Sequence, residues 1–280
     1  MEDTLGGKKM KREDIKILIM RAPGTNCDLE TSRAFKELGT QPSVKHTQRV
    51  FKEKKLEEYD ILVFPGGFSY GDYVRSGAIW ATECEYRIGN ELVNFVDEGK
   101  PVIGICNGFQ QLVELGFLPG WDGKSKYPEA ALANSINGYQ NRWIRIKFTG
   151  RGNCAMMSKL ESGYILQCPV AHGEGRFLLP PDRKEEQLEK LKERDMLVWQ
   201  YVDENGELAD ENFPDNPNGS YADIAGICNP EGTVLGLMPH PERAFYGYPM
   251  PEWTKKGAPK KYGDGFQFFE SIVNYVEMKF

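Results

Sequence analysis

The chain has 280 residues, a formal net charge of −6 and 40% hydrophobic residues. These values are typical of one globular domain, and no apolar run approaches the roughly 18 residues that a membrane span needs. The acidic balance gives no basic footprint for nucleic acid. Residues 1–14 are charged and lack the apolar stretch of a signal peptide, so we expect an N-terminal extension there and a cytoplasmic protein.

Strands and helices alternate through the first half of the chain. The apolar runs at 15–20, 44–47, 61–64 and 101–106 predict strands, and 28–38, 47–56 and 77–98 predict helices. This alternation favours an α/β fold with a doubly wound, mostly parallel sheet flanked by helices, as in flavodoxin. Ligands of such sheets bind beyond the carboxyl ends of the strands, so the loops that follow residues 64 and 105 are expected to converge on one pocket.

The second half is less regular. We expect strands at 143–148, 163–170 and 233–238, a solvated surface helix at 182–195, a loop at 210–220 and a closing helix at 266–278. The predicted organisation is a single domain over 15–280 with insertions near 182–220 and 246–264. The lysines at 255, 256, 260 and 261 indicate either contact with an acidic partner or, more simply, a solvated loop.

The segment from Pro101 to Gln110 is an apolar run that stops at Cys106 and continues as a short helical pattern. Gly104 and Gly108 lie two residues to either side of the cysteine, the spacing of a nucleophile elbow, in which strand and helix nearly touch. The helix N-terminus would lower the thiol pKa. The alternative is a buried structural cysteine.

The six cysteines show no CxxC spacing, and the three histidines form no HExxH motif. In a reducing cytoplasm this pattern predicts neither a disulfide framework nor a metal site.

A reactive cysteine needs a base, and His240 is the strongest candidate among the histidines. It follows the predicted strand at 233–238, and Pro239 and Pro241 stiffen the turn around it. Glu242 lies two residues further on and can orient the imidazole. Cys106, His240 and Glu242 therefore form a chemically complete catalytic triad. A histidine between prolines is otherwise often structural.

The double glycine after residue 64 suits acyl transfer, which builds negative charge on a carbonyl oxygen. Backbone N–H groups beside the nucleophile stabilise that charge as an oxyanion hole. The candidates are the N–H groups of Gly67 and Asn107. A plain tight turn is the alternative for the glycines.

Together these motifs resemble the class I, triad-type glutamine amidotransferases. Within that class the sequence is most similar to the family of glutaminase subunits of phosphoribosylformylglycinamidine synthases. The similarity spans about residue 16 to the C-terminus and rests on six segments: Arg21-Ala-Pro-Gly-Thr-Asn-Cys-Asp28, Phe64-Pro-Gly-Gly-Phe-Ser-Tyr-Gly-Asp72, Gly104-Ile-Cys-Asn-Gly-Phe-Gln110, Ala171-His-Gly-Glu-Gly-Arg-Phe177, Asp223-Ile-Ala-Gly-Ile-Cys-Asn229 and Pro239-His-Pro-Glu-Arg-Ala244.

The resemblance implies a glutaminase whose ammonia passes to a separate synthetase subunit. That subunit would use ATP and Mg²⁺ to convert formylglycinamide ribonucleotide to formylglycinamidine ribonucleotide, and a small third subunit would complete the complex. No cofactor is expected in this chain. Gln110 and Gly66 would help to bind glutamine.

The segment from His172 to Arg176 resembles a family segment near the mouth of the active site and the synthetase interface. We therefore assign His172, Glu174 and Arg176 to gating or docking. His172 is the second candidate for the base.

Two other functions were weighed. A cysteine hydrolase or stress protein of the intracellular-peptidase type shares the elbow, but there a histidine commonly follows the cysteine, whereas Asn107 follows here. A partner subunit without catalysis would be expected to lack Cys106, His240 or Glu242, and the sequence retains all three.

Overall fold

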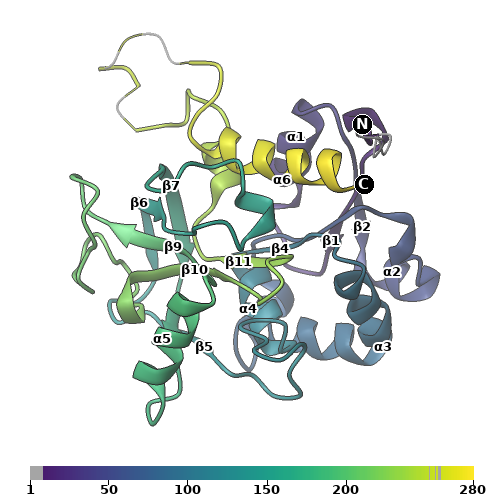
Figure 1. Cartoon of the computed structure of the whole chain (residues 1–280), viewed down its shortest axis with the longest axis horizontal. Coiled ribbons are helices and arrows are strands. Elements are labelled where there is room, and N and C mark those ends of the chain that lie inside the picture. Colours follow the sequence, from purple (N-terminus) through teal and green to yellow (C-terminus); the bar gives the residue numbers. More distant parts are fainter. Residues whose placement is uncertain (1–8, 252, 256, 258–259) are drawn as a thin grey trace, which may run out of the picture.

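The computed structural model describes residues 9–251, 253–255, 257 and 260–280. Within them the main sheet has nine strands in the order β2-β1-β3-β4-β11-β10-β9-β6-β7, and β5 pairs with β8 in a small second sheet (Figure 1). The strands are β1 Lys16–Arg21, β2 Gln41–His46, β3 Ile61–Phe64, β4 Val102–Ile105, β5 Ala131–Asn134, β6 Gln140–Phe148, β7 Ile165–His172, β8 Glu174–Leu178, β9 Leu197–Val202, β10 Ile224–Cys228 and β11 Val234–Leu237.

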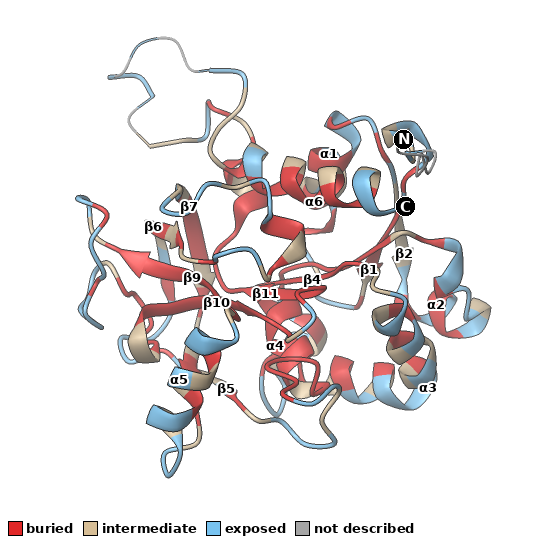
Figure 2. Ribbon diagram, viewed as in Figure 1, coloured by how far each residue is buried: buried red, intermediate tan, exposed pale blue. Residues whose placement is uncertain are grey.

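The helices of the first half and the C-terminal helix cover both faces of the parallel part of this sheet, and one further helix, α5, lies beside the antiparallel part (Figure 1). They are α1 Asp28–Glu37, α2 Thr47–Glu53, α3 Ala78–Asp97, α4 Asn107–Glu114, α5 Lys184–Glu193 and α6 Gly265–Lys279. Figure 1 shows α1 and α6 over one face and α3 and α4 over the other. Strands β1, β3, β4 and β11 are buried almost throughout (Figure 2), whereas the edge strand β2 is only partly buried, so the core lies on both sides of the inner strands. The predicted α/β, doubly wound fold class is confirmed.

The sheet changes character at β11. From β2 to β11 the pairing is parallel, and from β11 to β7 it is antiparallel. Parallel strands need long crossovers, which the helices of the first half supply. The antiparallel half instead runs through turns and irregular loops, which explains the less regular sequence there.

Most strands and helices of the first half lie where the sequence predicts them, but β5, β8, β9 and β10 were missed. Strand β9 lies inside the predicted insertion at 182–220, although all six of its residues are buried and it pairs with both β10 and β6. This part of the segment therefore belongs to the core of the sheet, because β9 has neighbours on both sides, and the insertion itself stays a prediction. A strand buried on both faces shows no polar alternation, so its residues are only a weak signal for a strand.

Two predicted segments, the N-terminal extension and the insertion at 246–264, are only partly described. Residues 1–8 of the predicted N-terminal extension lie outside the described residues, as do 252, 256, 258 and 259 of the predicted insertion at 246–264, Lys256 among them. Arg12 bonds to Glu277 at 3.0 Å and, more weakly, to Glu270 at 3.7 Å, which ties the described part of the extension to α6. The proposed domain boundaries stay predictions.

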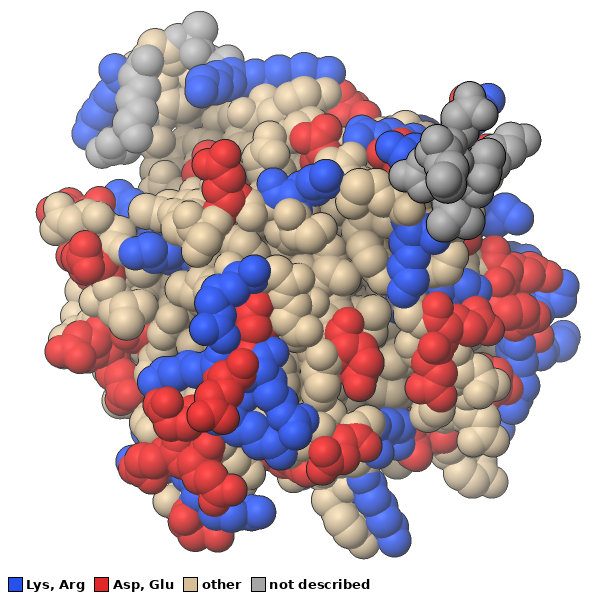
Figure 3. All heavy atoms as spheres, viewed as in Figure 1, with Lys and Arg blue, Asp and Glu red and all other residues tan. Residues whose placement is uncertain are grey.

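The surface mixes charges of both signs. On the face shown in Figure 3, Lys and Arg are interleaved with Asp and Glu, and no continuous basic area covers it. Among the described residues, no helix combines the length and apolarity that crossing a bilayer requires.

Strand β4 and helix α4 meet at two glycines that have no room for a side chain. A Cβ on Gly104 would lie 2.5 Å from the carbonyl oxygen of Gly108, and one on Gly108 would lie 1.8 Å from that of Phe64. Both obstacles are backbone atoms, which cannot move without shifting a strand or the helix. This close approach is the elbow that the sequence predicts around Cys106.

We expect Gly108→Ala to lower the free energy of unfolding by about 1–3 kcal/mol, because the added methyl collides with β3. Gly89→Ala in α3 is the matched control, since its Cβ would meet only the carboxylate end of Glu85, at 3.3 Å. Alanine favours a helix over glycine by about 0.5–1 kcal/mol, so the control should be neutral or stabilised. Urea denaturation of both variants checks this, and equal effects would contradict the packing described.

Candidate active site

Three loops converge at the carboxyl edge of the parallel strands. Gly104 of β4 pairs with Phe64 of β3 on one side and with Gly236 of β11 on the other, so these strands end together. The N–H of Cys106 donates to the carbonyl of Leu237 at 2.8 Å. The double-glycine loop, the elbow and the segment that carries His240 therefore meet at one place, as the sequence predicts.

Cys106 has a backbone conformation that non-glycine residues rarely adopt. Its φ is 53° and its ψ is −108°, between the end of β4 and the first residue of α4. The turn holds the thiol above the strand ends, where it is 3% exposed. Strain of this kind is stored mainly at functional sites, which favours the nucleophile over a structural cysteine.

His240 and Glu242 form the pair that the sequence predicts. Nδ1 of His240 lies 2.6 Å from Oε1 of Glu242, and both side chains are buried. Because the carboxylate accepts from Nδ1, the other ring nitrogen, Nε2, is left for proton exchange with the thiol. Nε2 has no hydrogen-bond partner in the described part of the chain.

The environment favours a thiolate and an imidazolium. Burial by itself raises the pKa of the Cys106 thiol, but the charges and hydrogen-bonding groups of His240 and His172 outweigh it and bring the pKa to about 6. Burial likewise lowers the pKa of His240, yet Glu242 and Cys106 raise it well above its usual value. At neutral pH the pair is therefore charged, which activates the nucleophile.

A second cysteine lies behind the ring of His240. Sγ of Cys27 is 3.8 Å from Nδ1 of His240 and accepts a hydrogen bond from Nη2 of Arg243 at 3.1 Å. Burial raises the pKa of Cys27, and His240 only partly opposes this. The motif from Arg21 to Asp28 contains this cysteine, but nothing in the sequence indicates that it would contact the catalytic histidine.

Ligand atoms of Cys27, His240 and Glu242 lie within 4.8 Å of one another, close enough in principle for a metal ion. The Nδ1–Oε1 hydrogen bond fills the space between two of them, and the guanidinium of Arg243 disfavours a cation beside the sulfur. These residues suit a hydrogen-bonded catalytic unit better than a metal centre.

Gly66 packs directly against the catalytic ring. A Cβ there would lie 2.7 Å from Cε1 of His240 and 3.2 Å from Sγ of Cys27. Its carbonyl accepts from the N–H groups of Asn26 and Cys27. The structure thus gives Gly66 a packing role, and its predicted contact with glutamine stays a prediction.

The two predicted oxyanion donors have free N–H groups. Gly67 has a φ of 146° and Asn107 begins α4, and neither N–H donates a hydrogen bond within the described chain. The first N–H groups of a helix are unpaired and carry partial positive charge. Gly67 and Asn107 can therefore serve a developing oxyanion, and their role remains a prediction.

Gln110 is 4% exposed, and its amide is occupied inside the protein. Its Oε1 accepts from Nδ2 of Asn107 at 3.1 Å, and its Nε2 donates to the carbonyl of Glu174 at 2.7 Å. These bonds tie the start of α4 to the start of β8. The predicted role of Gln110 in substrate binding is not tested by this arrangement.

His172 lies at the nucleophile rather than at the surface. It ends β7, is 3% exposed, and its imidazole acts on the thiol of Cys106. The buried ring lies beside the elbow, which is compatible with gating, and the gating or docking role of His172 stays a prediction. Glu174 and Arg176 are half-buried: the carboxylate of Glu174 accepts from the N–H of Ser76, and Nε of Arg176 donates to the carbonyl of Gly219.

The packing of β7 explains why the sequence missed this position. Strands β11, β10, β9 and β6 separate β4 from β7 in the sheet. Nevertheless Sγ of Cys106 lies 4.0 Å from the carbonyl oxygen of Ala171, and the N–H of His240 donates to the carbonyl of Pro169 at 2.9 Å. Strand β7 of the antiparallel half therefore lies against the turn that carries Cys106. The order of segments along the chain does not indicate this contact.

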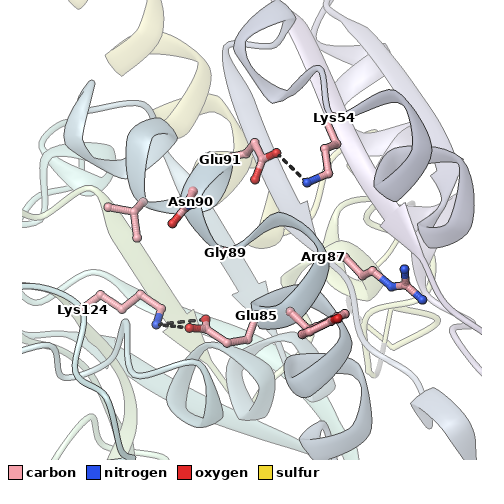
Figure 4. Close-up of a pocket in the computed structure, with 9 residues that line it drawn as sticks. Lys54, Glu85, Arg87, Gly89, Asn90, Glu91 and Lys124 are labelled. Carbon is pink, nitrogen blue, oxygen red and sulfur yellow. Dashed lines mark hydrogen bonds and ion pairs between the residues drawn. The ribbon is translucent and has the colours of Figure 1, made fainter.

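A surface pocket of about 440 Å³ lies elsewhere, beside α3 (Figure 4). Its lysines are both paired: Lys54 with Glu91 at 3.2 Å and Lys124 with Glu85 at 2.9 Å. None of its lining residues belongs to the predicted site. These two lysines are therefore already paired and are not available to a charged ligand.

Comparisons with known proteins agree with this geometry. Residues 14–276 match the family model of the CobB/CobQ-like glutamine amidotransferase domain. The chain is 42% identical over 279 residues to phosphoribosylformylglycinamidine synthase subunit PurQ of Archaeoglobus fulgidus, covering 96% of this chain and 99% of the relative. Its identity to the Methanococcus maripaludis subunit of the same name is 38% over 272 residues, covering 93% of this chain and 97% of the relative.

Among solved structures, a chain in the structure of PurLQS from Thermotoga maritima matches with a TM-score of 0.70 and 31% identity. The match covers 94% of this chain and 99% of that chain. The fold and the site define a class I glutamine amidotransferase. Within that class, the chain belongs to the PurQ family of phosphoribosylformylglycinamidine synthase subunits. The resemblance noted in the sequence is confirmed, and the intracellular-peptidase alternative is not favoured.

We expect Cys106 to be the cysteine that a small electrophile such as iodoacetamide modifies fastest, with a half-maximal rate near pH 6. A thiolate with a lowered pKa is present above that pH and is lost as the pH falls through it. Burial raises the pKa of Cys27, Cys84 and Cys168. Mass mapping across a pH series measures this, and preferential labelling of Cys27 or Cys228 would overturn the assignment.

In the same assay, Glu242→Gln should move the midpoint for Cys106 upward by about one pH unit or more. The amide keeps an oxygen for Nδ1 of His240 but removes the negative charge that stabilises the imidazolium, so the thiolate loses part of its counter-charge. Glu37→Gln, which alters an exposed ion pair with Lys261, is the control and should leave the midpoint unchanged. An unchanged midpoint in Glu242→Gln would show that the carboxylate does not support the pair.

Proposed function

We propose that this chain hydrolyses glutamine to glutamate and ammonia with Cys106, His240 and Glu242, and delivers the ammonia to a separate synthetase subunit. The main support for this proposal is the buried pair of Cys106 and His240, whose pKa shifts favour a thiolate and an imidazolium. Glu242 at 2.6 Å from Nδ1 supports the charged ring. The membership of this chain in the glutamine amidotransferase family supports the same chemistry.

In the first half-reaction the thiolate of Cys106 attacks the side-chain amide carbon of glutamine, and a C–S bond forms. The N–H groups of Gly67 and Asn107 stabilise the negative charge that develops on the amide oxygen. His240 gives its Nε2 proton to the nitrogen, the C–N bond breaks, and ammonia leaves. The product on the enzyme is a thioester.

In the second half-reaction His240, now neutral, takes a proton from water. The hydroxide attacks the thioester carbon, the C–S bond breaks, and glutamate leaves with the thiolate restored. Glu242 holds the ring in the same orientation in both steps. The balance is one glutamine and one water to one glutamate and one ammonia.

The solved relative belongs to a complex called PurLQS, which supports two partners for this chain: a synthetase subunit and a small third subunit. In this proposal the synthetase uses ATP and Mg²⁺ to convert formylglycinamide ribonucleotide to formylglycinamidine ribonucleotide. This chain then needs no cofactor of its own. A cytoplasmic location, without nucleic acid or membrane partners, belongs to the same proposal.

A strained loop beside the oxyanion site suits control by a partner. Tyr70, Asp72 and Val74 all have positive φ, and the side chains of Tyr73 and Val74 are 75% and 84% exposed. Asp72 contacts Nδ2 of Asn107 at 3.4 Å. Contact of a partner with this loop would therefore be transmitted to the start of α4, and we expect slow hydrolysis by the isolated chain.

A complex rebuilt with Cys106→Ala should fail with glutamine as nitrogen donor yet still aminate formylglycinamide ribonucleotide when ammonium salt and ATP are supplied. The substitution removes the nucleophile and leaves the synthetase untouched. Product formation with each donor is the measurement, and the wild-type complex is the control. Equal loss of both activities in a complex shown to be assembled would contradict a role confined to ammonia supply.

A further inference from the structure

The imidazole of His172 is fixed in one tautomer. Its Nε2 lies 2.6 Å from Oδ1 of Asn218, which is fully buried. Nδ2 of Asn218 donates to the carbonyl of Gly175 at 3.0 Å and to the hydroxyl of Tyr201 at 2.9 Å. A carbonyl only accepts, so the amide nitrogen of Asn218 faces Gly175 and its oxygen faces His172. Nε2 of His172 therefore carries the proton.

This leaves Nδ1 of His172 as an acceptor. It is buried, no group in the described part of the chain meets it in hydrogen-bonding geometry, and the neighbouring group on that side of the ring is the thiol of Cys106. The ring has little freedom to turn away, since a Cβ on Gly175 would lie 2.4 Å from its Cδ2. Leaving a buried acceptor unpaired is unfavourable, and such groups in native proteins commonly have a functional partner.

The two imidazoles beside Cys106 are supported differently. His240 is backed by the carboxylate of Glu242, which stabilises a positive ring, whereas His172 is backed by the neutral amide of Asn218. His240 is thus suited to hold a proton and His172 to accept a hydrogen bond, a division set by environment.

We propose that Nδ1 of His172 accepts a hydrogen bond from the side-chain NH₂ group of glutamine and so selects an amide over a carboxylate. The inference rests on the proposed glutaminase function. When the thiolate of Cys106 is about 3–3.5 Å from the amide carbon, the NH₂ group on that carbon is also beside the thiol. The end of β7 that carries His172 lies there too, since Sγ of Cys106 is 4.0 Å from the carbonyl oxygen of Ala171. One N–H then faces Nδ1, and the nitrogen lone pair is free to take the proton of His240.

Selection follows from the chemistry of the product. Glutamate offers no N–H at this position, and its negative carboxylate would face the lone pair of Nδ1. A site built to bind a substrate N–H leaves its own acceptor unpaired with an analogue that lacks it, which is a strong source of discrimination. His172 would therefore favour binding of glutamine and release of glutamate.

The test compares glutamine with glutamate γ-methyl ester, which presents the same carbonyl to Cys106 but no N–H. In the assembled complex, His172→Gln should lower kcat/KM for glutamine roughly tenfold more than for the ester, because a glutamine side chain can reach Asn218 but leaves no acceptor at the position of Nδ1. His172→Asn, whose amide lies near the position of Nδ1, should restore part of the preference. Glutamate should inhibit His172→Gln more strongly than the wild type.

Ester hydrolysis also reports whether each variant is folded and whether the thiolate works. Equal losses for amide and ester in both His172 variants would overturn the inference and leave His172 a purely structural role, and unchanged amide activity would overturn it as well. A wild-type complex that hydrolyses neither substrate would instead refute the proposed function.

A charge substitution gives an independent check. Asn218→Asp places a carboxylate on Nε2 of His172, which stabilises a protonated ring and turns Nδ1 into a donor. The preference for amide over ester should fall, and glutamate should inhibit more strongly because its carboxylate can now accept from Nδ1. Unchanged selectivity and inhibition in an ester-active Asn218→Asp variant would contradict the proposal.

Discussion

The site depends on the parallel pairing of β4 with β11. The two strands are in register from Val102 to Ile105, and the N–H of Cys106 bonds to the carbonyl of Leu237 just beyond it. This pairing fixes where the nucleophile and the segment that carries His240 leave the sheet. Because the two side chains lie far apart in the sequence, at positions 106 and 240, no local interaction could bring them together. The hydrogen bonds between β4 and β11 bring the ends of the two strands together. Short turns after each strand then place the two side chains next to each other.

The glycines extend this constraint to the other elements of the site. Gly108 allows α4 to lie against the backbone of Phe64, and Gly66 allows the ring of His240 to lie where a methyl group would stand. The loop after β3, the start of α4 and the segment after β11 are therefore packed backbone to backbone. Such contacts hold catalytic groups more firmly than long flexible side chains would, which suits preorganised stabilisation of charge. The strained φ of Cys106 is maintained by the same packing.

The electrostatic environment gives chemically similar groups different properties. Cys106 and Cys27 are both buried beside His240, yet the pKa of Cys106 is lowered and that of Cys27 is raised. For Cys106 the two imidazoles outweigh burial, whereas for Cys27 burial is the larger effect. The two histidines differ for a related reason, since one is backed by a carboxylate and the other by an amide. The chemistry of each group is set by its neighbours and not by its residue type.

The sequence by itself determined the fold class, the elbow and the candidate triad. The spacing of Gly104, Cys106 and Gly108 is local and has one structural meaning, and the carboxyl ends of parallel strands necessarily share an edge, which brings His240 to the elbow. Only the tertiary structure decided the positions of Cys27, His172 and Asn218. Their places depend on how the antiparallel half returns across the sheet, through long-range contacts that leave no periodic signal in the sequence. The sequence therefore places His172 only near the mouth of the active site, whereas the structure buries it beside the thiol, and Asn218 belongs to a segment that the sequence describes only as a loop.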